Sequence, residues 1–185
     1  MHVIRLALLL GLVLFNLAAI AKEPKIEEVA EGQKLKTDYY DSGAVRAITR
    51  TDKEGLTIGT LYHDDAGVPS HLELLDREGK IKTKTHYNAL GDAIKNEEYG
   101  PTGKPKTMRE FDVESKTVNR IVVFGAEGNV LKDIRSKNGK PQKGEDFYPN
   151  GTLKTEHFFD AEGNYANRVD YDESGKKIIE SLEGK

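Results

Sequence analysis

The sequence contains no cysteine among its 185 residues. Disulfide bridges, cysteine-ligated zinc and thiol catalysis are therefore excluded. An excess of one charge is also missing, because 28 Lys and Arg residues against 31 Asp and Glu residues leave a net charge of −3 at pH 7. The two signs are interleaved along the chain. Without a basic tract to attract phosphates, we expect no nucleic-acid partner.

Apolar residues are scarce outside the N-terminus. Seventeen of the first 21 residues are apolar, whereas the fraction for the whole chain is 37%. The basic start Met1 to Arg5, the apolar run and the ending Ala19-Ile20-Ala21 are typical of a secretory signal peptide. We expect cleavage after Ala21 and export to the bacterial periplasm or the medium, with no stable membrane anchor. The alternative is a retained anchor, but a membrane span needs about 20 uninterrupted apolar residues, and both Asn16 and the small-residue ending favour cleavage.

Glycines recur with a period of twelve residues. The positions are Gly43, Gly55, Gly67, Gly79, Gly91 and Gly103, and then Gly139, Gly151, Gly163 and Gly175. Ser115 holds the next position after Gly103, and Gly128 comes one residue late. The pattern indicates one residue inserted before Gly128 and one deleted after it. A regular period of this kind predicts a repeat architecture.

The residues before each glycine predict a β-hairpin turn. An aromatic or large apolar residue lies four positions before many of the glycines, and Asp, Asn or Gly three positions before. Asp or Asn followed three residues later by Gly favours a type I turn that ends in a left-handed residue. The residue before the turn then lies opposite the residue two after the glycine. These opposite residues include Val45, Ile81, Ala93, Val130, Leu153 and Tyr165.

The spacing also predicts where the aromatic side chains point. About eight residues remain between turns, close to an ordinary strand length. Because twelve is an even number, we expect every strand to present its aromatic on the same side of the sheet. The expected row is Tyr87, Tyr99, Phe111, Phe124, Phe147, Phe159 and Tyr171. It is interpreted mainly as the core of a chain that offers little else to bury.

The predicted fold is all-β, an antiparallel meander of ten to twelve short strands in one elongated or curled sheet. Residues 22–38 are interpreted as a linker or a degenerate repeat, and residues 39–185 as the hairpin repeat domain. Pro69, Pro105 and Pro141 recur every 36 residues. Since proline is tolerated at strand starts and edges, this slower period leaves a β-solenoid with three strands per turn as an alternative.

Two groups of repeat units resemble known families. Units such as FDAEGN and YDESGK resemble the YD repeats of Rhs-type bacterial surface and toxin proteins, whereas YYDSGAVR and FYPNGTLK resemble variant MORN repeats of exported bacterial proteins. The resemblance covers residues 39 to 178. It implies antiparallel hairpins in an elongated sheet or shell, with roles in scaffolding, encapsulation or partner contact. It carries no catalytic residues to this chain.

Catalytic and metal-binding patterns are weak. His63-Asp64-Asp65 is the only local cluster of candidate metal ligands, and Asp64 already has a role in forming a turn. The serines lack a nucleophile-elbow motif, and the phosphate-loop motif is absent. We therefore expect no catalytic, cofactor or metal site, and a protein that is not an enzyme.

Aromatic pairs suggest where a partner would bind. Phe147-Tyr148 and Phe158-Phe159 place rings on both faces of the predicted sheet, and Tyr171 lies close to them in the repeat. We expect these residues to contact an envelope or secreted protein, or a polysaccharide. The expected function is a non-enzymatic interaction or scaffold module of the cell envelope. The alternatives are an antitoxin-like neutraliser of an effector and a glycan-active hydrolase that uses the abundant carboxylates.

Overall fold

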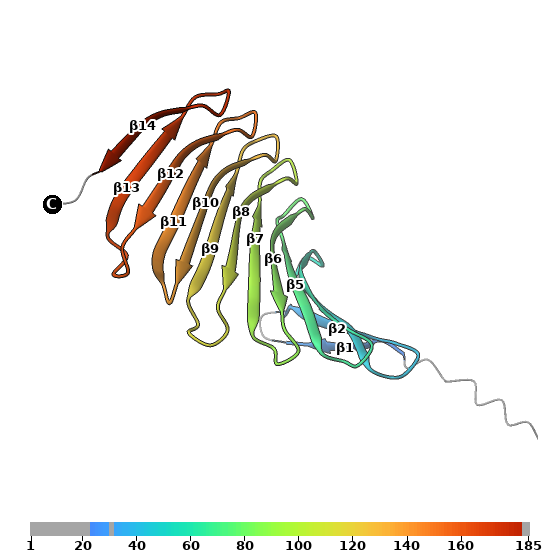
Figure 1. Cartoon of the computed structure of the whole chain (residues 1–185). Helices are drawn as coiled ribbons and strands as arrows, with labels where there is room; N and C mark the ends of the chain where they lie inside the picture. The colour runs from blue at the N-terminus through green and yellow to red at the C-terminus, as the bar shows by residue number, and fades with distance from the viewer. Residues whose placement is uncertain (1–22, 30–31, 183–185) are drawn as a thin grey trace, which may run out of the picture.

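The computed structural model describes residues 23–29 and 32–182, which form one antiparallel sheet of 14 strands (Figure 1). The strands follow each other in chain order from β1 to β14, and the two ends of the sheet do not meet. The all-β hairpin meander is thus confirmed as an open sheet. The predicted signal peptide, residues 1–21, lies outside the described residues.

The strands are short and nearly uniform, with six to eight residues in all but the first. Their bounds are β1 Lys25–Glu28, β2 Lys34–Tyr39, β3 Val45–Thr51, β4 Thr57–His63, β5 Pro69–Leu75, β6 Ile81–Tyr87, β7 Ala93–Tyr99, β8 Pro105–Phe111, β9 Val118–Phe124, β10 Val130–Lys137, β11 Lys140–Phe147, β12 Leu153–Phe159, β13 Tyr165–Tyr171 and β14 Lys177–Leu182. The segment interpreted as a linker or degenerate repeat contributes β1 and most of β2, joined through Gly32 at φ 74°.

The predicted turns are present, as the one between β3 and β4 illustrates. The Asp52 carboxylate accepts hydrogen bonds from the backbone N–H groups of Glu54 and Leu56, at 2.9 and 2.8 Å. The N–H of Gly55 donates to the carbonyl of Asp52, and Gly55 has φ 86°. Local side-chain hydrogen bonds and a left-handed glycine therefore close the hairpin.

Two turns absorb the irregularity around Gly128. After β8 the turn is one residue longer, and Lys116 takes the left-handed position at φ 56°. After β10 the turn shrinks to Asn138-Gly139, with φ values of 51° and 76° that are typical of a two-residue hairpin. The structure therefore shows the inserted and deleted residues that the sequence indicated.

The register confirms the predicted cross-strand pairs but not the predicted single aromatic row. Tyr87 lies opposite Ala93, and Phe159 lies opposite Tyr165. Beyond each such pair the register shifts by one residue, so that His86 pairs with Lys95. In this β-bulge, two residues of one strand lie opposite one residue of the partner strand. The side chains beyond the bulge therefore point to the opposite face from the one that simple alternation predicts.

The expectation that all the aromatics share one side is therefore wrong, because a bulge follows the first pair of each hairpin from β2 to β10 and from β11 to β14. Successive strands place their aromatics on alternate faces. We call the side that carries Glu73, Lys84 and Glu97 face A, and the side that carries Ile48, Leu61 and Leu72 face B.

The core is thin, as a single layer requires. Among the described residues only Ala47, Val122 and Val169 are buried apolar residues, and Thr60, Asp133 and Thr155 are buried polar ones. Every strand pairs with its sequence neighbours in one continuous sheet. The solenoid alternative is therefore wrong, and Pro69 and Pro105 simply begin β5 and β8.

Candidate functional site

A cleft of about 520 Å³ lies on β2–β5 and the start of β6. Its apolar lining is aliphatic throughout and consists of Leu35, Ile48, Ile58, Leu61, Leu72, Leu74 and Leu75. These side chains are half-buried, except for Leu74, which is 43% exposed. An open group of large aliphatic side chains on a chain this rich in charge is a candidate binding surface.

The strand register explains why these residues meet. Ile48, Leu61 and Leu72 are direct cross-strand neighbours on face B. A second row beside them runs through Leu35, Arg50, Gly59 and Leu74. Because period-2 alternation places both rows on one side, residues from 40 positions of sequence gather in one patch.

Gly59 forms the floor of the cleft. A Cβ atom at this position would lie 2.8 Å from Cδ2 of Leu74 and 2.8 Å from the carbonyl oxygen of Glu73. The missing side chain therefore lets Leu74 lean across β4. This close approach, rather than a turn, is the reason for glycine inside a strand here.

The charged lining of the cleft is entirely basic. Arg50 and Lys82 line it, and no acidic residue does. The Arg50 guanidinium donates from Nε to Oε1 of Gln33 at 2.8 Å, and its Nη2 contacts the same oxygen. Neither Arg50 nor Lys82 has a carboxylate within 4.0 Å in the part of the chain that is described. The cleft thus offers aliphatic surface beside positive charge.

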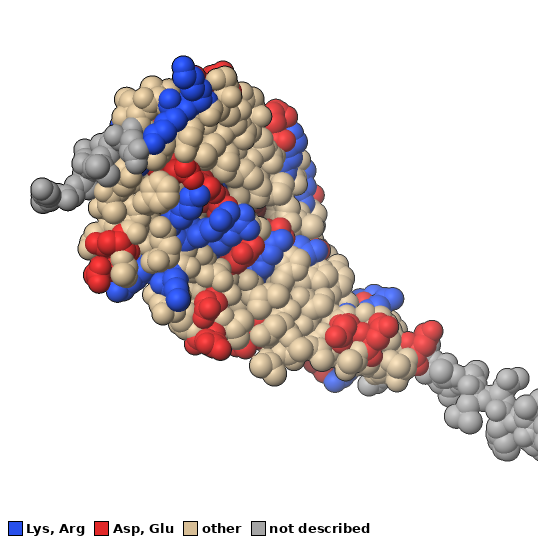
Figure 2. All heavy atoms as spheres, viewed as in Figure 1, with Lys and Arg blue, Asp and Glu red and all other residues tan. Residues whose placement is uncertain are grey.

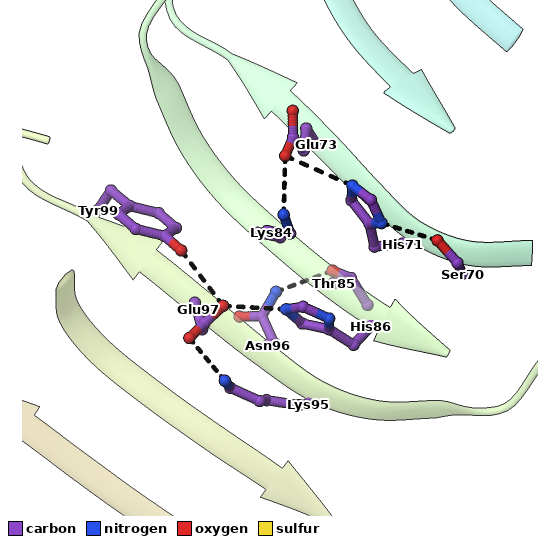
Figure 3. A network of polar contacts seen from close by, with 10 residues as sticks. All are labelled: Ser70, His71, Glu73, Lys84, Thr85, His86, Lys95, Asn96, Glu97 and Tyr99. Atoms are coloured by element: carbon purple, nitrogen blue, oxygen red, sulfur yellow. Dashed lines mark hydrogen bonds and ion pairs between the residues drawn. The ribbon is translucent and has the colours of Figure 1, made fainter. Parts of the chain in front are cut away.

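Face A carries polar networks instead (Figure 3). Glu73 accepts from Nζ of Lys84 at 3.0 Å and lies 3.5 Å from Nε2 of His71. On β7, Glu97 contacts Nε2 of His86 at 3.0 Å and Nζ of Lys95 at 2.7 Å. Figure 2 shows the same mixture of signs, with basic and acidic side chains adjacent across the hollowed middle of the molecule. Opposite charges therefore hold adjacent strands together across this face.

The protonation preferences in this network follow from burial and neighbouring charge. Burial lowers the pKa of His71, and the charge of Lys84 lowers it further. Burial acts to raise the pKa of Glu97, but hydrogen bonds from Lys95 and His86 outweigh it and bring the pKa below its usual value. Glu97 is therefore a stable anion, and its role is to pair cations.

A second network on face A joins β11 to β13. Nζ of Lys143 contacts Glu145 at 2.9 Å and Glu156 at 2.7 Å. The hydroxyl of Tyr171 donates to Glu156 at 2.6 Å. The two opposed carboxylates are bridged by a cation, and the pKa of Glu156 is lowered chiefly by its hydrogen bond from Lys143. General acid catalysis needs a carboxyl with a raised pKa, whereas the pKa of Glu156 is lowered.

The residues predicted to contact a partner lie at the C-terminal end of the sheet. Phe158 neighbours Lys143 on face A, and Phe159 points to face B, where its ring meets that of Tyr165 edge-on at 6.1 Å. Phe147 and Tyr171 lie on face A, and the hydroxyl of Tyr148 donates to the carbonyl of Tyr171 at 3.0 Å. All five are half-buried. The structure does not bring them into one patch.

The aliphatic cleft was missed by sequence reasoning, which concentrated on aromatic residues. A signal was nevertheless present, because strands 57–63 and 69–75, with the sequences TIGTLYH and PSHLELL, together contain five Ile or Leu residues, unlike the charged strands that follow. Alternate positions in such segments face one side.

Metal and membrane features are not found among the described residues. No group of three or more His, Cys, Asp or Glu side chains there could hold a metal ion, and His63-Asp64-Asp65 forms no such group. Within residues 23–29 and 32–182, no helix has the length and apolar character to cross a membrane.

Comparisons with known proteins give structural similarity at low sequence identity. No family model matches the sequence, and no curated protein matches it. The crystal structure of TarM shares 18% identity and a TM-score of 0.40, over 56% of this chain and 20% of that one. The TcdB2-TccC3-Cdc42 structure shares 10% identity and a TM-score of 0.23, over 79% of this chain and 11% of that one.

The Tc holotoxin pore of Photorhabdus luminescens shares 11% identity and a TM-score of 0.19, over 81% of this chain and 10% of that one. The chain thus spans a fifth or less of the length of each of these three proteins. At such identities and TM-scores the similarity assigns no function or family to this chain.

Proposed function

We propose that this chain is a non-enzymatic repeat module of the bacterial cell envelope that binds another protein through face B. The observation that supports this most is the aliphatic cleft on β2–β5, which no second layer of the described residues covers. Sheets normally bury their apolar face against another element. In this protein, the partner would take the position of the second layer and cover the aliphatic cleft.

The remaining surface supports binding rather than chemistry. The most buried carboxylate, that of Asp133, and the opposed Glu145 and Glu156 are held in ion pairs with Arg or Lys. Such pairing lowers the pKa of Asp133 and of Glu156, whereas a general acid at neutral pH needs a carboxyl with a raised pKa. The sheet is therefore best suited to presenting a fixed surface.

The experiment that tests this function is affinity capture from the envelope and secreted fractions, with the wild-type protein compared with two variants. Leu74→Glu places a charge in the cleft at a side chain that is 43% exposed, so the fold should tolerate it. Leu90→Glu makes the same change at a turn residue that is 86% exposed, outside the cleft. A stoichiometric partner that is captured by the wild-type protein and by Leu90→Glu, but not by Leu74→Glu, is the expected result.

Two results would contradict the proposal. One is capture of the same proteins by the Leu74→Glu variant as by the wild-type protein. The other is turnover of envelope glycans by the purified protein, which would favour the hydrolase alternative. Circular dichroism of each variant separates loss of the surface from loss of the fold.

A further inference from the structure

We propose that the cleft binds an amphipathic α-helix of the partner protein, with aliphatic side chains on the docked face and carboxylates beside them. This inference rests on the proposed function and names the class of partner. It follows from three properties of the cleft: its backbone hydrogen bonds, its dimensions and its charge.

The strands of the cleft are paired on both of their edges. β2, β3, β4 and β5 each pair with a strand on both sides. A partner that approaches face B therefore meets mainly side chains, because the paired backbone groups of these strands are directed at the neighbouring strands. An extended peptide lying on this face would lose hydrogen bonds to water without replacement, which is costly for each buried group. A helix satisfies its own backbone groups and brings only side chains.

The dimensions of the cleft suit a short helix. Neighbouring strands lie about 4.8 Å apart, so β2 to β5 span about 14 Å. A helix rises about 1.5 Å per residue, so ten residues, or nearly three turns, cross this distance. Leucine-sized side chains at positions i, i+3, i+4 and i+7 would then meet the two rows that contain Leu61 and Leu74. The cleft volume of about 520 Å³ has room for several such side chains.

The charge of the cleft selects an acidic helix. Arg50 and Lys82 are the only charged residues in its lining. Gln33 holds the Arg50 guanidinium through Nε and Nη2, which leaves Nη1 available to a carboxylate. Glutamates that flank the apolar stripe of the helix would pair with both cations, and lysines there would be repelled.

The test uses three synthetic 16-residue peptides and the purified protein, with affinity measured by fluorescence anisotropy. The first peptide carries leucines at helical spacing with glutamates elsewhere. The second replaces the glutamates with lysines, and the third is the first with two central prolines that break the helix. We expect the acidic helix to bind at least about tenfold more tightly than either of the other peptides.

Variants of the protein separate the apolar and charged contributions. Leu74→Glu should lower the affinity of the protein for the acidic helix by about tenfold or more. The double change Arg50→Glu and Lys82→Glu should reverse the preference, so that the lysine peptide binds better. Lys106→Glu with Lys137→Glu alters net charge equally at exposed strand positions outside the cleft, and it should preserve the original preference.

Several results would overturn the inference. Equal binding of the proline peptide would indicate an extended ligand, and an unchanged preference in the Arg50→Glu, Lys82→Glu variant would remove the charge argument. Dimerisation through the cleft, or a fluorescent fatty acid that binds there while the acidic helix does not, would also contradict it. If affinity capture depends on Leu74 and the acidic helix still fails to bind, the proposed function stands and this inference fails.

Discussion

The carboxylate of Asp133 accepts two parallel hydrogen bonds from the guanidinium of Arg120, at 3.0 Å from Nε and 2.9 Å from Nη2. Asp133 is buried in the middle of β10, so its charge depends on this partner. We predict that Asp133→Asn lowers the free energy of unfolding by about 1 to 3 kcal/mol, because a neutral amide cannot replace the bidentate pair. Urea unfolding measures the change. Glu114→Gln at an exposed turn is the control, and an equal effect of both substitutions would refute the prediction.

The stability of the protein should fall in acid. Burial acts to raise the pKa of Asp133, but the hydrogen bonds and charge of Arg120, with those of Arg135, outweigh it and depress the pKa. A carboxyl with a depressed folded-state pKa stabilises the fold above its unfolded pKa of about 3.9 and loses this contribution as the pH falls toward the folded value. Urea unfolding at several pH values should show this decline, with a shallower slope for Asp133→Asn. Identical slopes would contradict the assignment.

Gly59→Ala should destabilise the fold even though the φ angle of Gly59 is ordinary. The new Cβ would lie 2.8 Å from the carbonyl oxygen of Glu73, and a backbone atom cannot move aside cheaply. We expect a loss of about 1 to 3 kcal/mol, as for other overpacked sites. Thermal unfolding measures it, and hydrogen exchange should place the change in β4 and β5. An unchanged melting temperature would mean that the strands separate without cost.

Gly151→Ala should destabilise the protein for a different reason. Gly151 has φ 86° with open space around its Cβ position, so the cost is one of backbone conformation, about 1 kcal/mol. Gly100→Ala is the matched control, because its φ lies outside the left-handed region and the nearest atom would be 3.8 Å from the new Cβ. Chemical denaturation should separate the two variants. The prediction fails if both are neutral.

Phe159→Ala tests the predicted C-terminal contact. The ring is half-buried against Tyr165, so we expect a loss of about 1 to 2 kcal/mol, below the 3 to 5 kcal/mol typical of a fully buried phenylalanine. The melting temperature and partner capture are measured together. Weaker capture at an unchanged melting temperature would identify Phe159 as contact surface, as the sequence predicted.

The periodic features of the fold were predictable because they depend on local chemistry. Asp52 and Gly55 determine their turn through contacts within four residues, and the Tyr87–Ala93 pair follows from that turn. The irregularity around Gly128 was visible for the same reason. The number of strands was underestimated at ten to twelve, since the charged residues before position 39 also pair in the sheet.

The two faces and the cleft could not be read in the same way. The bulge between the Tyr87–Ala93 and His86–Lys95 pairs is a property of the paired strands, and no residue type marks it. Alternation without this bulge predicts that every aromatic lies on one side of the sheet. The cleft depends in turn on which side Ile48, Leu61 and Leu72 share, which only the register establishes.

The bulge in nearly every hairpin also constrains how such an array grows. Because each repeat reverses the side on which its aromatic lies, the duplication of one twelve-residue unit would transfer every later side chain to the opposite surface. The duplication of two units would restore both the strand direction and the side. Lineages that lengthen or shorten this protein without losing a binding surface should therefore differ by multiples of 24 residues.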